Sequence, residues 1–186
     1  MPKSFRQCLG ETGQLVSASS QAFVEDRVYV NNGICNSMCI QKMYGIMEGR
    51  LPSQKEMLEF GQWAREERGK CSARISESLH SRNVQVAAEY KGRWVYDELY
   101  AGNFIQASGY YYYLVGILNT ARSEGHALLV YSQAEKWLLY DPNFGTASFP
   151  YVGACLLALK RIMQNIYPSF GPFFPFVIWR LNPLPK

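Results

Sequence analysis

The stretch EGHALLVYSQAEKWLLYDPNFG, residues 124–145, decides the fold. It contains two apolar runs, His126–Ser132 and Trp137–Asp141, whose composition is typical of strands. A short polar connection joins the two runs and predicts an antiparallel hairpin centred on Ala134-Glu135. In that register, position 128 lies opposite position 141.

This hairpin places a histidine beside an acid. Side chains on a strand alternate between the two faces, so His126 and Asp141 fall on the same face as diagonal neighbours, with backbones roughly 7–8 Å apart. Pro142 cannot donate a hydrogen bond to a ladder, and we expect it to end the second strand. A shift of the register by one residue would separate the pair.

The sequence contains two histidines, so a histidine base would be His80 or His126. His80 lies among polar neighbours in a predicted helix, which is the setting of an ordinary surface residue. His126 follows Gly125 at the start of an apolar strand, where a base can face a cleft while the strand anchors it. We therefore predict that His126 is the base.

A helix is predicted directly after the turn signal Asn31-Asn32-Gly33. Apolar residues in 34–47 recur at helical spacing, and Gly49 is expected to end the helix in the left-handed conformation. Cys35 lies in the first turn of this helix. The helix dipole and the backbone amides there favour a thiolate, which is the reactive form of cysteine.

Cys35 is therefore the predicted nucleophile. Cys39 lies one turn further along the helix, where these effects have faded, and the other cysteines have no such setting. The backbone amide of Cys35, with a side-chain amide from Asn31 or Asn32, is predicted to hold an oxyanion. The residues alone leave a second interpretation equally open, in which Cys35 is only a small buried residue.

The remaining chain predicts an α+β domain with N-terminal helices packed against an antiparallel β-sheet. Residues 1–22 are expected to form a loosely ordered N-terminal arm, and residues 23–186 the folded domain. The further strands are predicted at 23–30, 110–118 and 176–181, and the further helices at 53–67, after a capping box, at 71–83 and at 151–165.

Composition narrows the possible functions. The 186 residues are 48% hydrophobic and 18% charged, which is ordinary for one globular domain. The net charge of +4 is scattered, so nucleic-acid binding is not expected. The five cysteines lack zinc-site spacing and predict thiols in a reducing compartment, with no metal and no disulfide framework. No run reaches the ~20 apolar residues of a membrane span.

Three motifs carry a resemblance to a known family. They are NGIC at 32–35, GHA at 125–127 and YDPNFG at 140–145, and they resemble the YopT/AvrPphB family of bacterial effector cysteine proteases. The resemblance implies a papain-like fold in which Cys35, His126 and Asp141 form the catalytic triad without a cofactor. Two features depart from the family: Met1-Pro2 offers no glycine for myristoylation, and no aromatic residue follows the nucleophile motif.

The expected function is that of a cysteine protease working by thiolate acyl transfer. The resemblance implies secretion by a bacterium, delivery into a target cell, and a protein substrate there. The N-terminus has no charged-then-apolar run, so no Sec signal peptide is expected. A secretion chaperone or a cognate inhibitor is a further expected partner. Two alternatives remain: a Cys-His-Asp amidase or acyltransferase toxin acting on cell wall or a small molecule, and an inactive papain-like binding module.

Overall fold

The computed structural model describes residues 4–18, 35–50, 53, 84–93, 104–105, 112–119, 124–170 and 175–183. In chain order its elements are α1 (Phe5–Leu9), β1 (Gln14–Ala18), α3 (Cys35–Met47), β2 (Val84–Arg93), β3 (Tyr112–Asn119), β4 (Glu124–Gln133), β5 (Lys136–Asp141), β6 (Gly145–Phe149), α7 (Val152–Asn165), the 3-10 helix η2 (Pro168–Phe170) and β7 (Pro175–Pro183).

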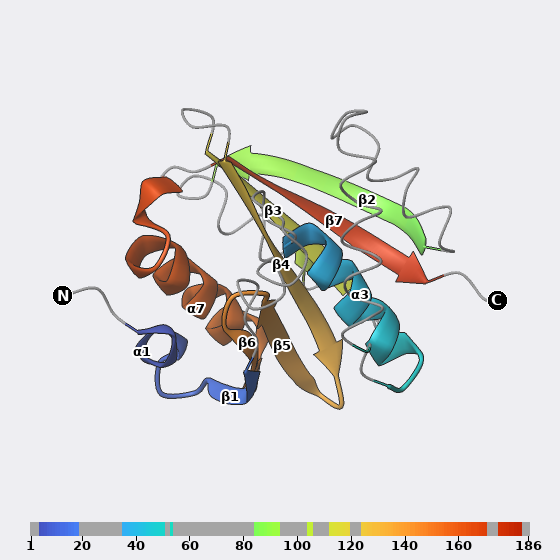
Figure 1. Ribbon diagram of the computed structural model, residues 1–186, viewed down its shortest axis with the longest axis horizontal. Helices are drawn as coiled ribbons and strands as arrows, with labels where there is room; N and C mark the ends of the chain where they lie inside the picture. The colour runs from blue at the N-terminus through green and yellow to red at the C-terminus, as the bar shows by residue number, and fades with distance from the viewer. Residues whose placement is uncertain are drawn as a thin grey trace.

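The described strands form a seven-stranded sheet in the order β1-β6-β5-β4-β3-β7-β2. Every neighbouring pair is antiparallel. The sheet is twisted, and β4 runs diagonally through its centre (Figure 1). The predicted α+β class, with helices packed against an antiparallel sheet, is confirmed.

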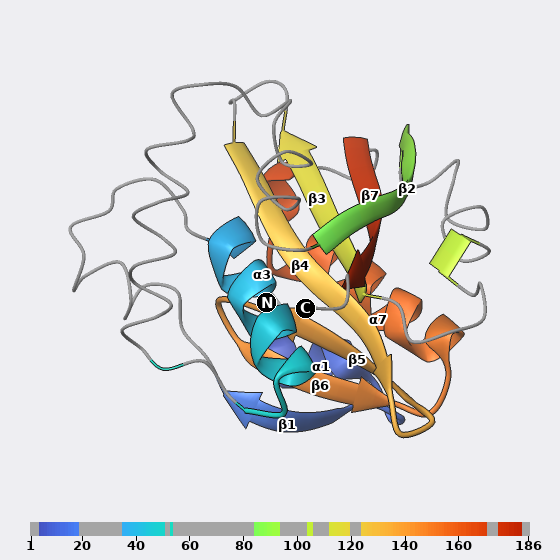
Figure 2. The same cartoon turned by 90° about the vertical axis from the view of Figure 1, so that its right-hand side faces the viewer.

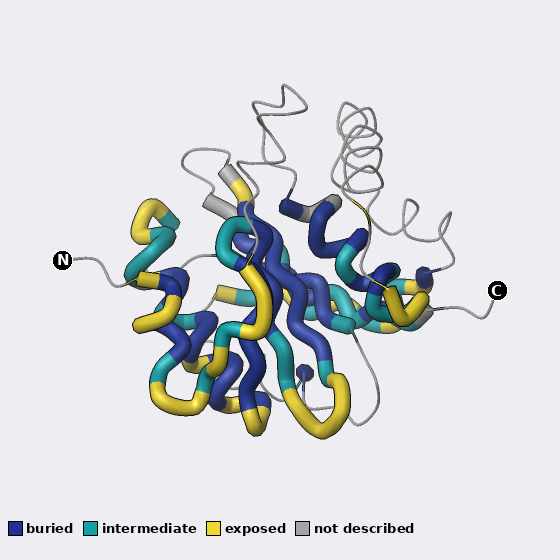
Figure 3. The backbone as a smooth tube through the Cα atoms, turned by 60° about the horizontal axis from the view of Figure 1, so that its bottom comes forward, coloured by how far each residue is buried: buried dark blue, intermediate teal, exposed yellow. Residues whose placement is uncertain are grey.

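The helices cover opposite faces of the sheet, with α3 on one side and α7 on the other (Figure 2). Because side chains alternate along a strand, β4 serves both layers. Leu128 and Val130 pack into the core under α7, whereas Ala127 and Leu129 pack into the core under α3. The sheet is therefore buried on both faces at its centre, and exposure is concentrated at its turns (Figure 3).

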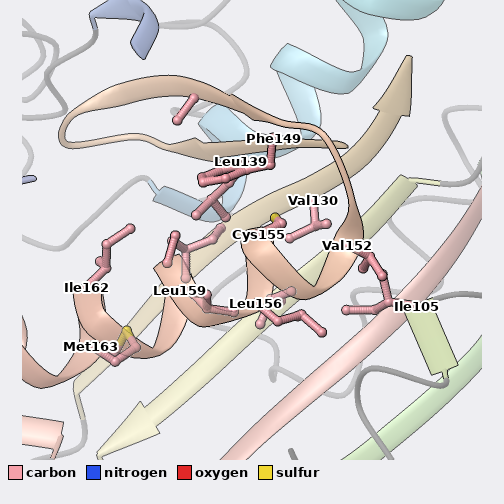
Figure 4. Packing of buried hydrophobic residues seen from close by; sticks show 14 of the residues in the cluster. Ile105, Val130, Leu139, Phe149, Val152, Cys155, Leu156, Leu159, Ile162 and Met163 are labelled. Carbon is pink, nitrogen blue, oxygen red and sulfur yellow. The ribbon is translucent and has the colours of Figure 1, made fainter. Parts of the chain in front are cut away.

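The core under α7 is built from an apolar stripe on that helix. Its buried residues repeat at helical spacing from Val152 to Met163 and meet Val130, Leu139 and Phe149 of the sheet (Figure 4). Burying one such side chain contributes about 1.5–3 kcal/mol. This packing fixes the end of α7, and the residues that follow it, against the sheet.

Most predicted elements in the described part are confirmed within two residues of their expected ends. They are the strands at 110–118, 126–132, 137–141 and 176–181 and the helices at 34–47 and 151–165. Gly49 has a φ of 69°, as expected for the residue that ends α3. The strand predicted at 23–30 and the helix at 71–83 lie outside the described residues, as does the helix at 53–67 except for Ser53.

The described part of the N-terminal segment differs from the expected loose arm. Ser4 and Gln7 form a capping box that opens α1, and β1 pairs with β6. At Gly145, with a φ of 122°, a Cβ would overlap the carbonyl oxygen of Ser17. Elements α1 and β1 were not predicted, because each has only five residues, and β2 and β6 were not predicted either.

Candidate active site

The β4–β5 hairpin has the predicted register. Gln133 pairs with Lys136 and Leu129 with Tyr140, so position 128 falls opposite position 141. The two turn residues, Ala134 and Glu135, have φ values of 49° and 62°. Two left-handed residues make the tight turn whose twist matches the flanking strands.

This register brings His126 and Asp141 into contact. Nε2 of His126 lies 3.2 Å from Oδ1 of Asp141, and the two side chains are 6% and 0% exposed. Strand β5 ends at Asp141, before Pro142, as the sequence predicts. The backbone N–H of Asn143 donates to the same Oδ1 at 2.9 Å, so the turn after β5 helps to hold the carboxylate.

Cys35 completes the cluster from the other side of the sheet. It is the first residue of α3 and is 5% exposed. A side-chain hydrogen bond links it to His126. Because Nε2 of His126 is engaged by Asp141, Nδ1 is the ring nitrogen left for the thiol. The structure therefore brings together the three side chains that the sequence predicted as a group.

The surroundings favour the charged form of His126. Burial lowers the pKa of a histidine because it disfavours the cation. The hydrogen bonds and negative charges of Asp141 and Cys35 outweigh this effect and raise the pKa of His126 from 6.5 to about 10. An imidazolium beside a cysteine is the arrangement that stabilises a thiolate.

The other described cysteines lack this setting. Cys39 is completely buried, and its Sγ lies 3.5 Å from the carbonyl oxygen of Ala127. Burial, followed by the nearby charges of Cys35 and Asp141, raises the pKa of Cys39 well above its usual value. Burial also raises the pKa of the Cys155 thiol, on the buried face of α7. Both thiols are held in the unreactive protonated form.

Tyr167 also belongs to the cluster, although no pattern in the sequence predicted it. The hydroxyl of Tyr167 lies 3.2 Å from Oδ1 and 3.1 Å from Oδ2 of Asp141. Its ring centroid lies 4.5 Å from that of His126. No motif marks Tyr167, because its place depends on how α7 packs on the sheet.

Four of the candidate site residues lie outside the part of the chain that the structure describes. Asn31 and Asn32, the candidates for the oxyanion site, lie outside the described residues, as do His80 and Cys71. Their roles remain predictions. Within the described ranges no group of three or more His, Cys, Asp or Glu side chains is arranged to hold a metal ion, and no helix is long and apolar enough to cross a membrane.

Known proteins resemble this chain in structure more than in sequence. No family model matches it, and no curated protein matches it. The Pseudomonas avirulence protein AvrPphB aligns with a TM-score of 0.57 at 15% identity, over 96% of this chain and 100% of that one.

A second solved structure is PatoxP, a cysteine protease-like domain of the Photorhabdus asymbiotica toxin PaTox. It aligns with a TM-score of 0.57 at 11% identity, over 96% of this chain and 56% of that one, so this chain spans little more than half of the PatoxP structure. At such identities the comparisons establish the fold. The resemblance to AvrPphB is therefore confirmed at that level, and the chain has the papain-like cysteine protease fold.

Proposed function

We propose that this protein is a cysteine-type peptidase that works by thiolate acyl transfer. The observation that carries the proposal is the buried contact of 3.2 Å between His126 and Asp141, with Cys35 hydrogen-bonded to the same imidazole. A nucleophile, a base and an acid that orients the base are the parts such a reaction requires. The papain-like fold supports the same assignment.

The reaction starts from the Cys35 thiolate and the His126 imidazolium. The sulfur attacks the substrate carbonyl carbon and forms a tetrahedral intermediate, whose oxyanion is held by backbone and side-chain amides. The imidazolium gives its proton to the leaving amine as the carbon–nitrogen bond breaks. The neutral imidazole then takes a proton from water, which attacks the thioester; the acid product and the Cys35 thiolate separate, and the thiolate–imidazolium pair is restored. Asp141 keeps the imidazole oriented throughout.

The start of α3 is the proposed oxyanion site. The first turn of a helix presents backbone amides that favour negative charge, and Cys35 occupies that turn. Its own amide is the first proposed donor. A side-chain amide from Asn31 or Asn32 is the second, because these residues lie only four and three positions before Cys35 in the sequence.

The proposed substrate is a protein inside a target cell into which a bacterium delivers this chain. The structural neighbours, an avirulence protein and a domain of a toxin, support this proposal. The described cysteines are thiols, which suits a reducing cytosol. A secretion chaperone or a cognate inhibitor would be a partner before delivery.

The experiment compares new protein N-termini in a recipient-cell lysate after addition of wild type, Cys35→Ala or Cys39→Ala. We expect new termini with wild type and with Cys39→Ala, since Cys39 is the same residue type one turn along the same helix, and none with Cys35→Ala. If Cys35→Ala produced as many new termini as wild type, the assignment of Cys35 as the nucleophile would be wrong. Release of cell-wall fragments without new protein termini would instead favour an amidase.

A further inference from the structure

Tyr167 is held by the backbone where α7 ends. Its N–H donates to the carbonyl oxygen of Ile162 at 3.3 Å, and its own carbonyl accepts from the N–H of Phe170 at 3.1 Å. The side-chain amide of Asn165 donates to the carbonyl oxygen of Arg161, one turn earlier in α7, at 2.7 Å. These hydrogen bonds hold the backbone of Tyr167 in place at the end of α7.

The Tyr167 hydroxyl acts as a donor to Asp141. Asn143 Nδ2 donates to Oη of Tyr167 at 2.8 Å, so the hydroxyl accepts there and its own proton points elsewhere. The Asp141 carboxylate, 3.1 Å from Oη at Oδ2, receives that proton. Burial, and next the negative charge of Asp141, raise the pKa of Tyr167, so the donor stays protonated.

The Tyr167 ring covers the imidazole. The two ring centroids lie 4.5 Å apart at an interplanar angle of 35°. Phe144 and Phe170 meet the tyrosine ring edge-on, at centroid distances of 6.4 and 6.3 Å. An aromatic face against a buried imidazolium is favourable, and the ring also keeps water from that side of His126.

We propose that Tyr167 is a positioning residue of the active site, whose hydroxyl fixes the Asp141 carboxylate and whose ring fixes the His126 imidazole. Among the described residues, Oδ1 of Asp141 has three hydrogen-bond donors around it, whereas Oδ2 has only the Tyr167 hydroxyl. Without that hydroxyl the carboxylate can turn about its Cβ–Cγ bond, and its contact with His126 lengthens. The inference rests on the proposed function.

The test is Tyr167→Phe, which keeps the ring and removes the hydroxyl. NMR titration of the resting protein reports the pKa of His126 without substrate, and the signal is assigned with His126→Gln. We expect the pKa of His126 to fall by about one pH unit, and kcat to fall about tenfold with KM unchanged. These values correspond to the loss of one hydrogen bond to a charged group.

Tyr151→Phe is the matched control, because Tyr151 is 58% exposed. Asn143→Ala is a second variant, which leaves the tyrosine in place but removes the donor that orients its hydroxyl; we expect a smaller change in the same direction. An unchanged His126 titration in both site variants would overturn the inference. Full activity of His126→Gln would instead overturn the proposed function, and the titration would still decide the role of Tyr167.

Discussion

Replacing Asp141 by asparagine tests the acid at the centre of the cluster. Asp141 is completely buried and accepts hydrogen bonds from His126, the backbone of Asn143 and the hydroxyl of Tyr167. An asparagine can keep its oxygen toward the first two donors. Its NH₂ group then faces the tyrosine hydroxyl, which can turn to accept. We therefore expect Asp141→Asn to fold, and to lose the negative charge together with the hydrogen bond that the Tyr167 hydroxyl donates.

The size of the effect follows from the pKa of His126. A rise from 6.5 to about 10 corresponds to about 5 kcal/mol of preference for the imidazolium. Burial opposes this preference, and Asp141 is the foremost group that supplies it, ahead of Cys35. A serine triad loses on the order of 10⁴ in turnover from the same change. A thiol ionises more easily than a hydroxyl, so we expect a loss of roughly 10²–10³ here.

The assay is kcat/KM as a function of pH, for wild type and Asp141→Asn. The alkaline limb, where the imidazolium loses its proton, should lie well above 6.5 in wild type and move toward neutral pH in the variant. Glu135→Gln makes the same chemical change at the exposed turn of the hairpin and should change nothing. Turnover of folded Asp141→Asn near the wild-type value would refute the reasoning and reduce Asp141 to a turn residue.

The contact between His126 and Asp141 also makes the stability of the protein depend on pH. Because the folded pKa of His126 is raised, its stabilising contribution is complete below pH 6.5 and is lost as pH rises through about 10. Within that window the free energy of unfolding should fall by up to about 1.4 kcal/mol per pH unit from this one proton. Urea unfolding at pH 6.5 and 9 should show a shallower dependence for Asp141→Asn.

Three further predictions concern other residues of the chain. Mild iodoacetamide at pH 6 should modify Cys35 before Cys39, because the raised pKa of Cys39 keeps that thiol protonated; peptide mapping checks this. Activity should be abolished by His126→Ala and changed less than a few-fold by His80→Ala, as kinetics of the two variants will show. Phe5→Ala should lower the free energy of unfolding by roughly 3–5 kcal/mol in a urea titration, because a buried ring is removed.

Each of these expectations has an outcome that contradicts it. If iodoacetamide labelled Cys39 or Cys71 before Cys35, the assignment of Cys35 as the nucleophile would be wrong. Equal losses from the two histidine variants would mean that the base is misassigned. For Phe5, which stacks on Phe144 at 4.9 Å, the control is Val16→Ala at a 61% exposed position, and equal destabilisation by both would show that α1 contributes no packing.

The hairpin was predictable because its determinants are local. Apolar runs set the strands, Pro142 set the end of the second strand, and the length of the polar connection set the register. The turn itself was not signalled, because Ala134 and Glu135 adopt left-handed φ values that glycine or asparagine usually occupy. The contact between His126 and Asp141 followed from register alone, without a motif for the turn.

The parts that sequence reasoning missed depend on distant packing. Tyr167 lies 26 positions from Asp141 and reaches it only because α7 folds back over the sheet. Strand β2 alternates between exposed and partly buried side chains after Val84, but apolar and polar residues do not alternate as regularly along its sequence. Strand β1 is five residues long and mostly exposed, so its pairing depends on the close approach that Gly145 permits.

The acid–base pair and the thiol of the site come from segments with very different separations in the sequence. His126 and Asp141 are 15 positions apart and are joined by a two-residue turn, so little loop entropy opposes their meeting. Helix α3 reaches β4 across a separation of 88 positions, at the contact of Cys39 with Ala127. Short-range contacts form faster than long-range ones. We therefore expect the acid–base pair to assemble early and the thiol to join it last, which pulse-labelled hydrogen exchange during refolding can time. Until α3 packs against β4, the chain would hold the acid–base pair without the nucleophile, and it would lack the proposed peptidase activity.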